Sequence, residues 1–194
     1  MRYGIRSVSM DDIARHLGIS KKTIYQVYAD KDELVFAVSR LHQDIWISHT
    51  QEISATAADA IEELLRFSVV LRQQLAEMNP SVMFDMYKFH RAAWDDFVDY
   101  KNKVMRARVR ESILRGIGEG YFRGDIDAEI LATLRVEQVE MAFNDNVFPH
   151  SHYKLDQVQL QLFDHFVFGL LTEKGRARYD SSRKEFSGDV KKIK

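Results

Sequence analysis

Residues 9–33 read SMDDIARHLGISKKTIYQVYADKDE, and this stretch decides the fold of the N-terminal part of the chain. Ile13 and Leu17 stand four residues apart, which predicts an apolar stripe along a first short helix. Ile24 and Val27 predict a similar stripe along a second helix. The segment is therefore expected to form two amphipathic helices whose apolar faces pack together.

A tight turn between the two helices is expected at Gly18, because glycine adopts a positive φ without steric cost. Ile19 is expected to fill the corner, and Ala14 is small enough to let the helices cross closely. Capping residues mark three helix starts, at Ser9 with Asp12, at Ser20, and at Asp30 with Glu33. This spacing is typical of a helix-turn-helix.

The exposed side of the second helix carries residue types that suit DNA. Cations neutralise phosphates or approach guanine, an amide can bond adenine, and hydroxyls can contact phosphate. The candidate DNA-binding residues are Ser9, Ser20, Lys21, Lys22, Thr23, Tyr25, Gln26, Tyr28 and Lys31. Residues 1–31 contain six Lys/Arg and three Asp, which favours an anionic partner. The alternatives are a helical interaction module or ligand-binding protein that does not bind DNA.

The segment resembles the N-terminal domain of tetracycline-repressor (TetR) family regulators over roughly residues 4–40. The resemblance lies in the pattern Val8-x4-Ile13-Ala14-x3-Gly18-Ile19-Ser20-x2-Thr23-Ile24-Tyr25-x2-Tyr28-x2-Lys31-x2-Leu34. It implies that the second helix reads the DNA and that Tyr25 and Lys31 contact its backbone. It also implies a transcriptional regulator that binds double-stranded, palindromic operator DNA as a homodimer and responds to a small-molecule effector.

One departure from the family pattern concerns the start of the chain. Family members carry a further helix before the Tyr-Gly pair that corresponds to Tyr3-Gly4, whereas this sequence starts at Met1. The first helix of the domain is therefore expected to be missing, through a start assigned too far downstream or through a genuine truncation. Without that covering surface, poor order or rearrangement is expected before Ser9.

Composition bounds the class of protein. The chain has 194 residues, 45% hydrophobic content, 28 Lys/Arg and 29 Asp/Glu, for a net charge of −1. This content is enough for a real core. There is no cysteine, no apolar run of about 20 residues and no signal-peptide pattern. These features favour a cytoplasmic protein with no disulfides and no membrane segment.

Beyond Leu34 the periodicity predicts an all-α body, since strand-like alternation is missing and only Pro80 and Pro149 interrupt the chain. Helices are expected near 31–48, 58–78, 81–89, 91–120, 127–145 and 155–173. The predicted domains are a helix-turn-helix domain (1–40), a helical ligand-binding and dimerisation domain (41–174) and a basic flexible tail (175–194).

An effector pocket is expected within the helical body, where Met and aromatic residues are frequent. The candidate ligand-binding residues are Met83, Phe84, Tyr87, His90, Trp94, Phe97, Phe122, Glu137 and Phe143, with His90 and Glu137 as polar anchors. For any one apolar residue, an ordinary place in the core is the alternative. The identity of the effector does not follow from these residues.

A dimer surface is expected on the last two helices. Residues 155–173 are apolar nearly all round, with a main stripe of Leu155, Val158, Leu162, Phe166 and Leu170 and additional width from Leu160, Phe163, Val167 and Leu171. Such breadth favours contact with a partner subunit, and a buried core helix is the alternative.

Catalytic and cofactor motifs are missing, so the chain is expected not to be an enzyme and to need no cofactor. It contains no Glu-x-x-His pair of a di-iron bundle, no Gly-x-Ser-x-Gly elbow and no phosphate-binding loop. His150 and His152 could ligate a metal only with a third ligand, and in an exposed loop they are more often plain polar residues. No metal site is therefore expected.

Overall fold

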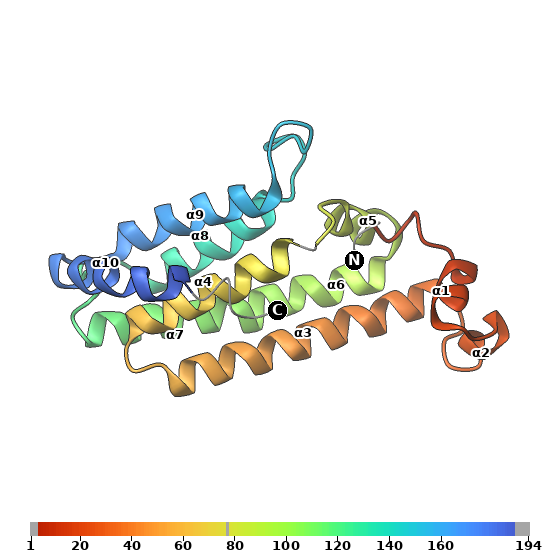
Figure 1. Ribbon diagram of the computed structural model, residues 1–194, viewed down its shortest axis with the longest axis horizontal. Helices are drawn as coiled ribbons and strands as arrows, with labels where there is room; N and C mark the ends of the chain where they lie inside the picture. Colours follow the sequence, from red (N-terminus) through yellow and green to blue (C-terminus); the bar gives the residue numbers. More distant parts are fainter. Residues whose placement is uncertain (1–3, 77, 189–194) are drawn as a thin grey trace.

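The chain folds into helices connected by short loops, as the computed structural model of residues 4–76 and 78–188 shows (Figure 1). The elements are α1 (Met10–Leu17), α2 (Lys21–Tyr25), α3 (Lys31–Thr56), α4 (Ala60–Ala76), α5 (Ser81–Phe89), α6 (Arg91–Tyr100), the π-helical segment η1 (Lys101–Met105), α7 (Arg106–Gly118), α8 (Ala128–Met141), α9 (Leu155–Leu170) and α10 (Glu173–Gly188). Within these residues the only strand-like pairing is an isolated bridge between Phe122 and Leu171. The predicted all-α class, with an N-terminal helix-turn-helix, is confirmed.

The helix-turn-helix lies at one end of an elongated molecule, and the body occupies the other end (Figure 1). Ser9 and Asp12 form a reciprocal capping box at the start of α1, as predicted. Gly18 ends the helix with φ 67°, in the left-handed region. The small core of this unit is formed by buried Met10, Ala14 and Ile24, against which Ile13, Tyr28 and Leu34 pack.

Part of the predicted packing between α1 and α2 is wrong. Val27 is 66% exposed, and Ile19 and Leu17 are exposed as well. The reason is the length of α2, which ends at Tyr25, so Val27 lies in the following turn and cannot continue the stripe of Ile24. Met10, which the predicted apolar stripes did not include, is buried in this small core instead.

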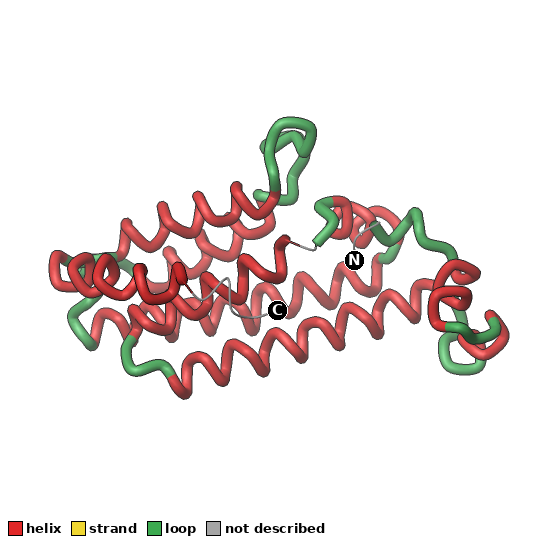
Figure 2. The backbone as a smooth tube through the Cα atoms, viewed as in Figure 1, coloured by secondary structure: helices red, strands yellow, loops and turns green. Residues whose placement is uncertain are grey.

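Helix α3 joins the two parts of the molecule without interruption. Asp30 caps its start by accepting a hydrogen bond from the backbone N–H of Glu33 at 2.9 Å. The helix then runs through the predicted boundary at residue 40 and ends at Thr56, eight residues later than expected. Figure 2 shows it as one rod that runs from the helix-turn-helix along most of the helical body. Helix α3 is therefore a continuous connection between the body and the helix-turn-helix.

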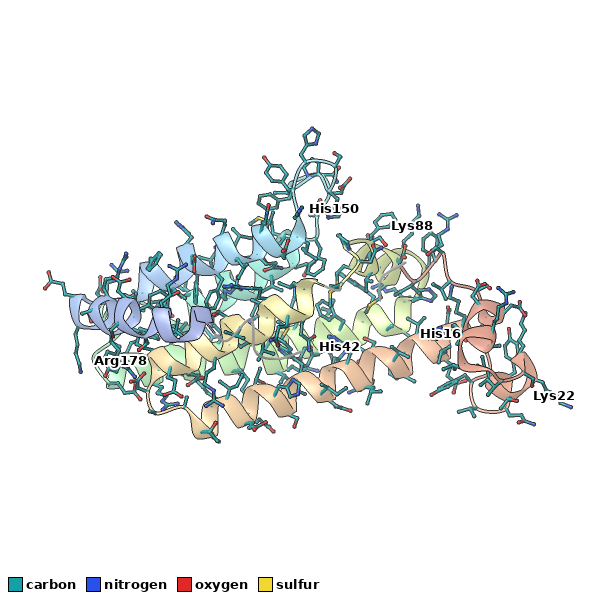
Figure 3. The ribbon with its side chains drawn as sticks, in the orientation of Figure 1. His16, Lys22, His42, Lys88, His150 and Arg178 are labelled. Carbon is teal, nitrogen blue, oxygen red and sulfur yellow. The ribbon has the colours of Figure 1, made fainter. Side chains whose placement is uncertain are left out.

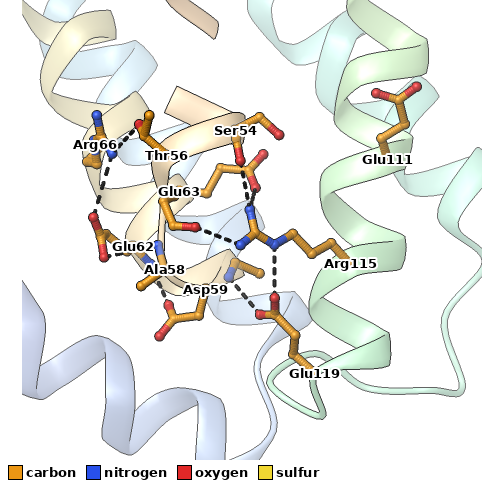
Figure 4. A network of polar contacts seen from close by, with 12 residues as sticks. Ser54, Thr56, Ala58, Asp59, Glu62, Glu63, Arg66, Glu111, Arg115 and Glu119 are labelled. Atoms are coloured by element: carbon orange, nitrogen blue, oxygen red, sulfur yellow. Dashed lines mark hydrogen bonds and ion pairs between the residues drawn. The ribbon is translucent and has the colours of Figure 1, made fainter. Parts of the chain in front are cut away.

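An Arg115 network fastens the far end of α3 to α4 and α7 (Figure 4). Its guanidinium donates hydrogen bonds to the carbonyl oxygens of Ser54 and Ala57 and to the carboxylates of Glu63 and Glu119, at 2.8–3.1 Å. These interactions hold the α3–α4 turn against the end of α7 and account for the late end of α3.

The body has one large apolar core, to which α4, α7, α8, α9 and α10 contribute. Within α9, Leu155, Val158, Phe163, Phe166, Val167 and Leu170 are buried inside the chain. Part of the broad apolar face of α9 was expected to meet a partner; these six residues lie in the core of the chain, and the contact with a partner stays a prediction. The alternative, a buried core helix, describes them correctly.

Residues 175–188 form most of helix α10, and the expectation of a flexible tail is wrong for this part. Tyr179 is 2% exposed, and Arg178 pairs with Asp59 at 2.9 Å. Figure 3 shows Arg178 on α10 at the end of the body opposite the helix-turn-helix. Residues 189–194 of the predicted tail lie outside the described residues.

Candidate DNA-binding surface and effector cavity

The exposed surface of α2 presents cations, hydroxyls and an amide on a short, well-capped helix. Ser20 caps α2, and its Oγ accepts a hydrogen bond from the backbone N–H of Thr23 at 3.1 Å. Lys21 pairs with Asp11 at 2.7 Å, and both side chains remain largely accessible. Lys22 points to solvent at the tip of the molecule (Figure 3). This geometry suits insertion of α2 into a groove of DNA.

Tyr25 and Gln26 extend the same surface. Both side chains are exposed, while their neighbour Ile24 is buried against α1. Thr23 is also exposed, and its hydroxyl lies 2.8 Å from that of Ser20. The sequence-predicted residues of α2 thus lie together on one accessible side.

Three further candidates for DNA contact have structural roles. Ser9 caps α1, and Tyr28 packs its ring against the small core of the helix-turn-helix. Lys31 donates hydrogen bonds from its Nζ to the carbonyl oxygens of Ile5 and Val8, at 2.7 and 2.6 Å. In this structure Lys31 is thus engaged within the chain, and its predicted contact with a DNA phosphate stays a prediction.

The segment before α1 connects the helix-turn-helix to α5. Asp85 is buried on α5, and its carboxylate accepts hydrogen bonds from the backbone N–H groups of Ile5 and Arg6, at 2.9 and 3.0 Å. Together with Lys31, Asp85 fixes residues 4–8 between two helices. Of the expected poor order or rearrangement before Ser9, poor order is wrong for residues 4–8, and rearrangement stays a prediction; residues 1–3 lie outside the described part.

A cavity of about 460 Å³ runs through the body and reaches the base of the helix-turn-helix. Most of its lining side chains are apolar; they come mainly from α3 to α9, and Ile5, Val8 and Ile13 of the N-terminal part line its end. Four of the predicted ligand-binding residues line it, namely Met83, Phe97, Phe122 and Phe143. The volume lies within the range of about 300–1,000 Å³ that is usual for small-molecule sites.

The other five predicted ligand-binding residues do not line the cavity. Phe84 and Tyr87 are exposed on α5, because Val82 and Met86 form the inward face of that helix. Trp94 packs edge-on against Tyr87, outside the lining. These three predictions are wrong because aromatic content does not tell which face of a short helix is buried.

The predicted polar anchors have intramolecular partners instead. His90 is buried, and its Nδ1 lies 2.7 Å from a carboxylate oxygen of Asp32 in the first turn of α3. Glu137 pairs with Lys101 at 3.1 Å, and Glu140 accepts a second hydrogen bond from the same ammonium. Burial lowers the pKa of Lys101, but the two carboxylates more than offset it, so the pKa is raised overall. Both predicted anchors are therefore paired within the chain and do not line the cavity.

The polar groups in the cavity lining are ones that the sequence analysis missed. His42 and Tyr100 line it, and burial raises the pKa of the Tyr100 phenol, which keeps that group a neutral hydrogen-bond donor. Figure 3 shows His42 near the middle of the molecule.

Arg135 is the most unusual of these lining groups. It is 4% exposed, and burial lowers its pKa to about 10, which leaves it a cation at neutral pH. Within the described residues, neither terminal nitrogen of its guanidinium has a hydrogen-bond partner. The sequence could have indicated the inward position of Arg135, because its helical spacing places it on the same face of α8 as Ala132, Val136 and Val139.

The fold and the exposed α2 surface define a helix-turn-helix protein with a helical body that encloses a cavity. Residues 1–38 match the family model described as bacterial regulatory proteins, tetR family. The HTH-type transcriptional repressor KstR2 of Mycobacterium tuberculosis is 25% identical over 131 residues. That match covers 66% of this chain and 66% of the relative, so about two thirds of the relative's length is matched.

Two solved structures share the architecture. A TetR-family transcriptional regulator from Agrobacterium tumefaciens has a TM-score of 0.71 at 15% identity, covering 87% of this chain and 90% of its own. FadR from Bacillus subtilis, solved in complex with stearoyl-CoA, has a TM-score of 0.60 at 16% identity, covering 86% and 90%. These two structures show the shared fold alone, while the family model over residues 1–38 and the curated relative support a TetR-family regulator.

Two further findings bear on other classes of protein. No helix among the described residues is long and apolar enough to cross a membrane. The same residues contain no group of three His, Cys, Asp or Glu side chains that could hold a metal ion. His150 pairs with Asp145, and His152 lies beside Ser151, in the loop before α9.

Proposed function

We propose that this protein is a transcriptional repressor that binds palindromic operator DNA as a homodimer and releases it when a small molecule fills the cavity. The exposed face of α2 supports the DNA-binding step, with Lys21 and Lys22 as phosphate or guanine contacts and Gln26 as a base contact. In a homodimer, the two copies of α2 would enter successive major grooves about 34–36 Å apart.

This proposal depends mainly on one observation, which is that the cavity extends from the body to the base of the helix-turn-helix. Its lining includes Ile5, Val8 and Ile13 of the N-terminal part as well as Arg135 and Phe163 deep in the body. A ligand in the cavity would therefore contact both the sensor body and the base of the DNA-binding unit. It would lower operator affinity if it bound better to a conformation whose two α2 helices no longer match the groove spacing.

We place the dimer contact on the outer face of α8. Ile130 is 65% exposed, and Leu134 and Met141 are exposed on the same side of the helix. These residues follow a spacing of i, i+4 and i+11, which aligns them along one helical face. An apolar stripe in this position favours contact with the same stripe of a second copy around a two-fold axis.

Selection from random double-stranded DNA tests the regulator function directly. We expect the full chain to enrich a palindrome, and the double variant Lys21→Glu with Lys22→Glu to lose retention on it. The matched control changes Lys103 and Lys154 to Glu, because both are exposed on the body and the change in charge is identical. Binding of the parent chain should fall steeply as salt increases. Enrichment of no palindrome, or equal losses for both double variants, would refute the proposal.

A further inference from the structure

Within the part of the chain that the structure describes, one charged side chain of the cavity lining lacks a partner at its terminal nitrogens. Among the described residues, the other charged side chains of the lining all have partners: Lys31 donates to two carbonyl oxygens, Glu63 accepts from Arg115, Arg108 pairs with Glu111, and Glu140 accepts from Lys101. Arg135 has no such partner at Nη1 or Nη2. The cavity therefore contains one uncompensated positive charge.

The surroundings of Arg135 compensate its charge only in part. Its guanidinium carbon lies 5.4 Å from the ring centre of Phe163 and 5.9 Å from that of Phe166. Aromatic faces attract a cation, but each contributes much less than the lost hydration of a buried guanidinium. A ligand that brings an anion to this place would gain the missing pairing energy.

We infer that the cavity binds an amphipathic monocarboxylate, with its head group paired to Arg135 and its apolar chain lying along α3. This inference rests on the proposed effector function of the cavity. Two free terminal nitrogens present the parallel donors that a carboxylate accepts in bidentate fashion. A single negative charge neutralises the site, whereas a dianion would leave an excess charge buried.

The apolar side chains of the lining favour a hydrocarbon chain as the remaining part of the ligand. Val35 and Val38 of α3, Val82 of α5 and Phe97 of α6 present hydrocarbon surface to the cavity. An unbranched acyl chain would bury its methylenes against these side chains. The affinity of linear carboxylates should then rise by up to about fourfold for each methylene added between octanoate and dodecanoate.

Isothermal titration calorimetry of the full chain with dodecanoate and with 1-dodecanol separates the head group from the chain. We expect the parent to bind dodecanoate more tightly, and Arg135→Met to weaken dodecanoate by about 30-fold or more. Dodecanol binding should change by less than about threefold. The matched control is Arg110→Met, which removes a cation of α7 that pairs with Glu129 outside the lining and should leave both affinities within about threefold.

Further outcomes decide against the inference. Equal losses for acid and alcohol in Arg135→Met, no loss at all, or failure of every acid from octanoate to hexadecanoate to bind the parent would overturn it. Tighter binding of dodecanoyl-CoA than of dodecanoate, independent of Arg135, would overturn it in favour of a thioester. Arg135→Lys guards against misfolding, because it keeps the charge but loses the bidentate fork, and its dodecanoate affinity should be intermediate. Operator selection is measured separately, so failure of the DNA-binding function remains distinguishable.

Discussion

At the scale of single residues, the guanidinium of Arg135 should destabilise the protein as long as the cavity is empty. A buried and unpaired charge loses its hydration without an equivalent gain, and apolar replacement of such groups is commonly neutral or stabilising. We expect Arg135→Met to raise the free energy of unfolding of the ligand-free chain by about 1–4 kcal/mol. Urea unfolding of delipidated protein measures this change. Arg108→Met should stay within about 0.5 kcal/mol, and a clear destabilisation by Arg135→Met would contradict the argument.

His42 should make the stability depend on pH. Burial lowers its pKa, and a hydrogen bond with Gln74 offsets only part of that shift. Because the native pKa lies below the ordinary value of about 6.5, the unfolded chain binds the proton more readily. Stability should therefore be full above that value and fall as pH decreases toward the native pKa.

The His42→Gln variant tests this expectation in urea titrations between pH 5 and 8. It should remove part of the acid-side loss of stability that the parent shows. His16→Gln, at an exposed position of α1, should reproduce the parent's profile. Identical profiles for the parent and His42→Gln would contradict a role of His42.

Gly116 and Gly118 form a matched pair within α7. A Cβ on Gly116 would lie 2.1 Å from the buried ring of Phe122, whereas a Cβ on Gly118 would have no atom within 4 Å. Gly116→Ala should destabilise by about 1–3 kcal/mol through overpacking. Gly118→Ala should stabilise by about 0.5–1 kcal/mol through helix propensity. Thermal unfolding of both variants measures the difference, and an equal effect would show that Phe122 moves freely.

At the scale of elements, local signals predicted the helices better than their packing. The start of α5 follows Pro80 as expected, and the Ser9 and Asp30 caps lie at the predicted residues. The end of α3 was underpredicted because it depends on Arg115, which is 58 or more residues away from the carbonyl oxygens it binds. Such a contact leaves no periodicity in the sequence.

Helix α10 is a second case in which local sequence patterns did not predict the packing. Its composition is basic and mostly polar, which favoured a flexible tail, yet Tyr179 packs into the core and Arg178 pairs with Asp59. A buried ring and an ion pair are among the contacts that dock this mostly polar helix. Neither partner is near in sequence, so composition alone could not predict the docking.

The anchoring role of Tyr179 gives an element-scale prediction. Tyr179→Ala removes a fully buried ring that packs edge-on against Phe168 and should cost about 3–5 kcal/mol of stability. Hydrogen exchange should show that α10 loses protection first. Asp180→Ala changes the neighbouring exposed residue and should cost less than about 0.5 kcal/mol. Similar stability of the two variants would mean that α10 is not fixed by Tyr179.

At the scale of the whole molecule, the two candidate sites differed in how far the sequence predicted them. The α2 surface depends on one helix, so the exposure of Lys21, Lys22 and Gln26 could be predicted from local spacing. The cavity depends on contributions from α3 to α9, and its polar groups were assigned to the wrong residues. His90 has a partner on α3, while Arg135 faces the cavity from α8. Only the assembled bundle distinguishes a paired polar residue from an unpaired one.

Coupling between cavity and DNA should depend on the segment of residues 4–8. Asp85 holds this segment to α5 through the N–H groups of Ile5 and Arg6, and Lys31 holds it to α3. Because α3 and α5 both line the cavity, a ligand that changes their separation would pull on this segment and on the helix-turn-helix beyond it. Asp85 is thus expected to transmit the ligand signal without contacting DNA.

Asp85→Ala, with the milder Asp85→Asn, tests this transmission. Coupling is the ratio of operator dissociation constants with and without saturating dodecanoate, typically 5- to 150-fold in allosteric proteins. We expect Asp85→Ala to reduce the ratio below about threefold while dodecanoate affinity stays within about threefold of the parent, since Arg135 is unchanged. Asp95→Ala, which removes an exposed partner of Arg91 on α6, should keep the parental ratio. Unchanged coupling in both Asp85 variants would mean that the signal travels along α3 alone, because α3 is the other continuous connection between the cavity and the helix-turn-helix.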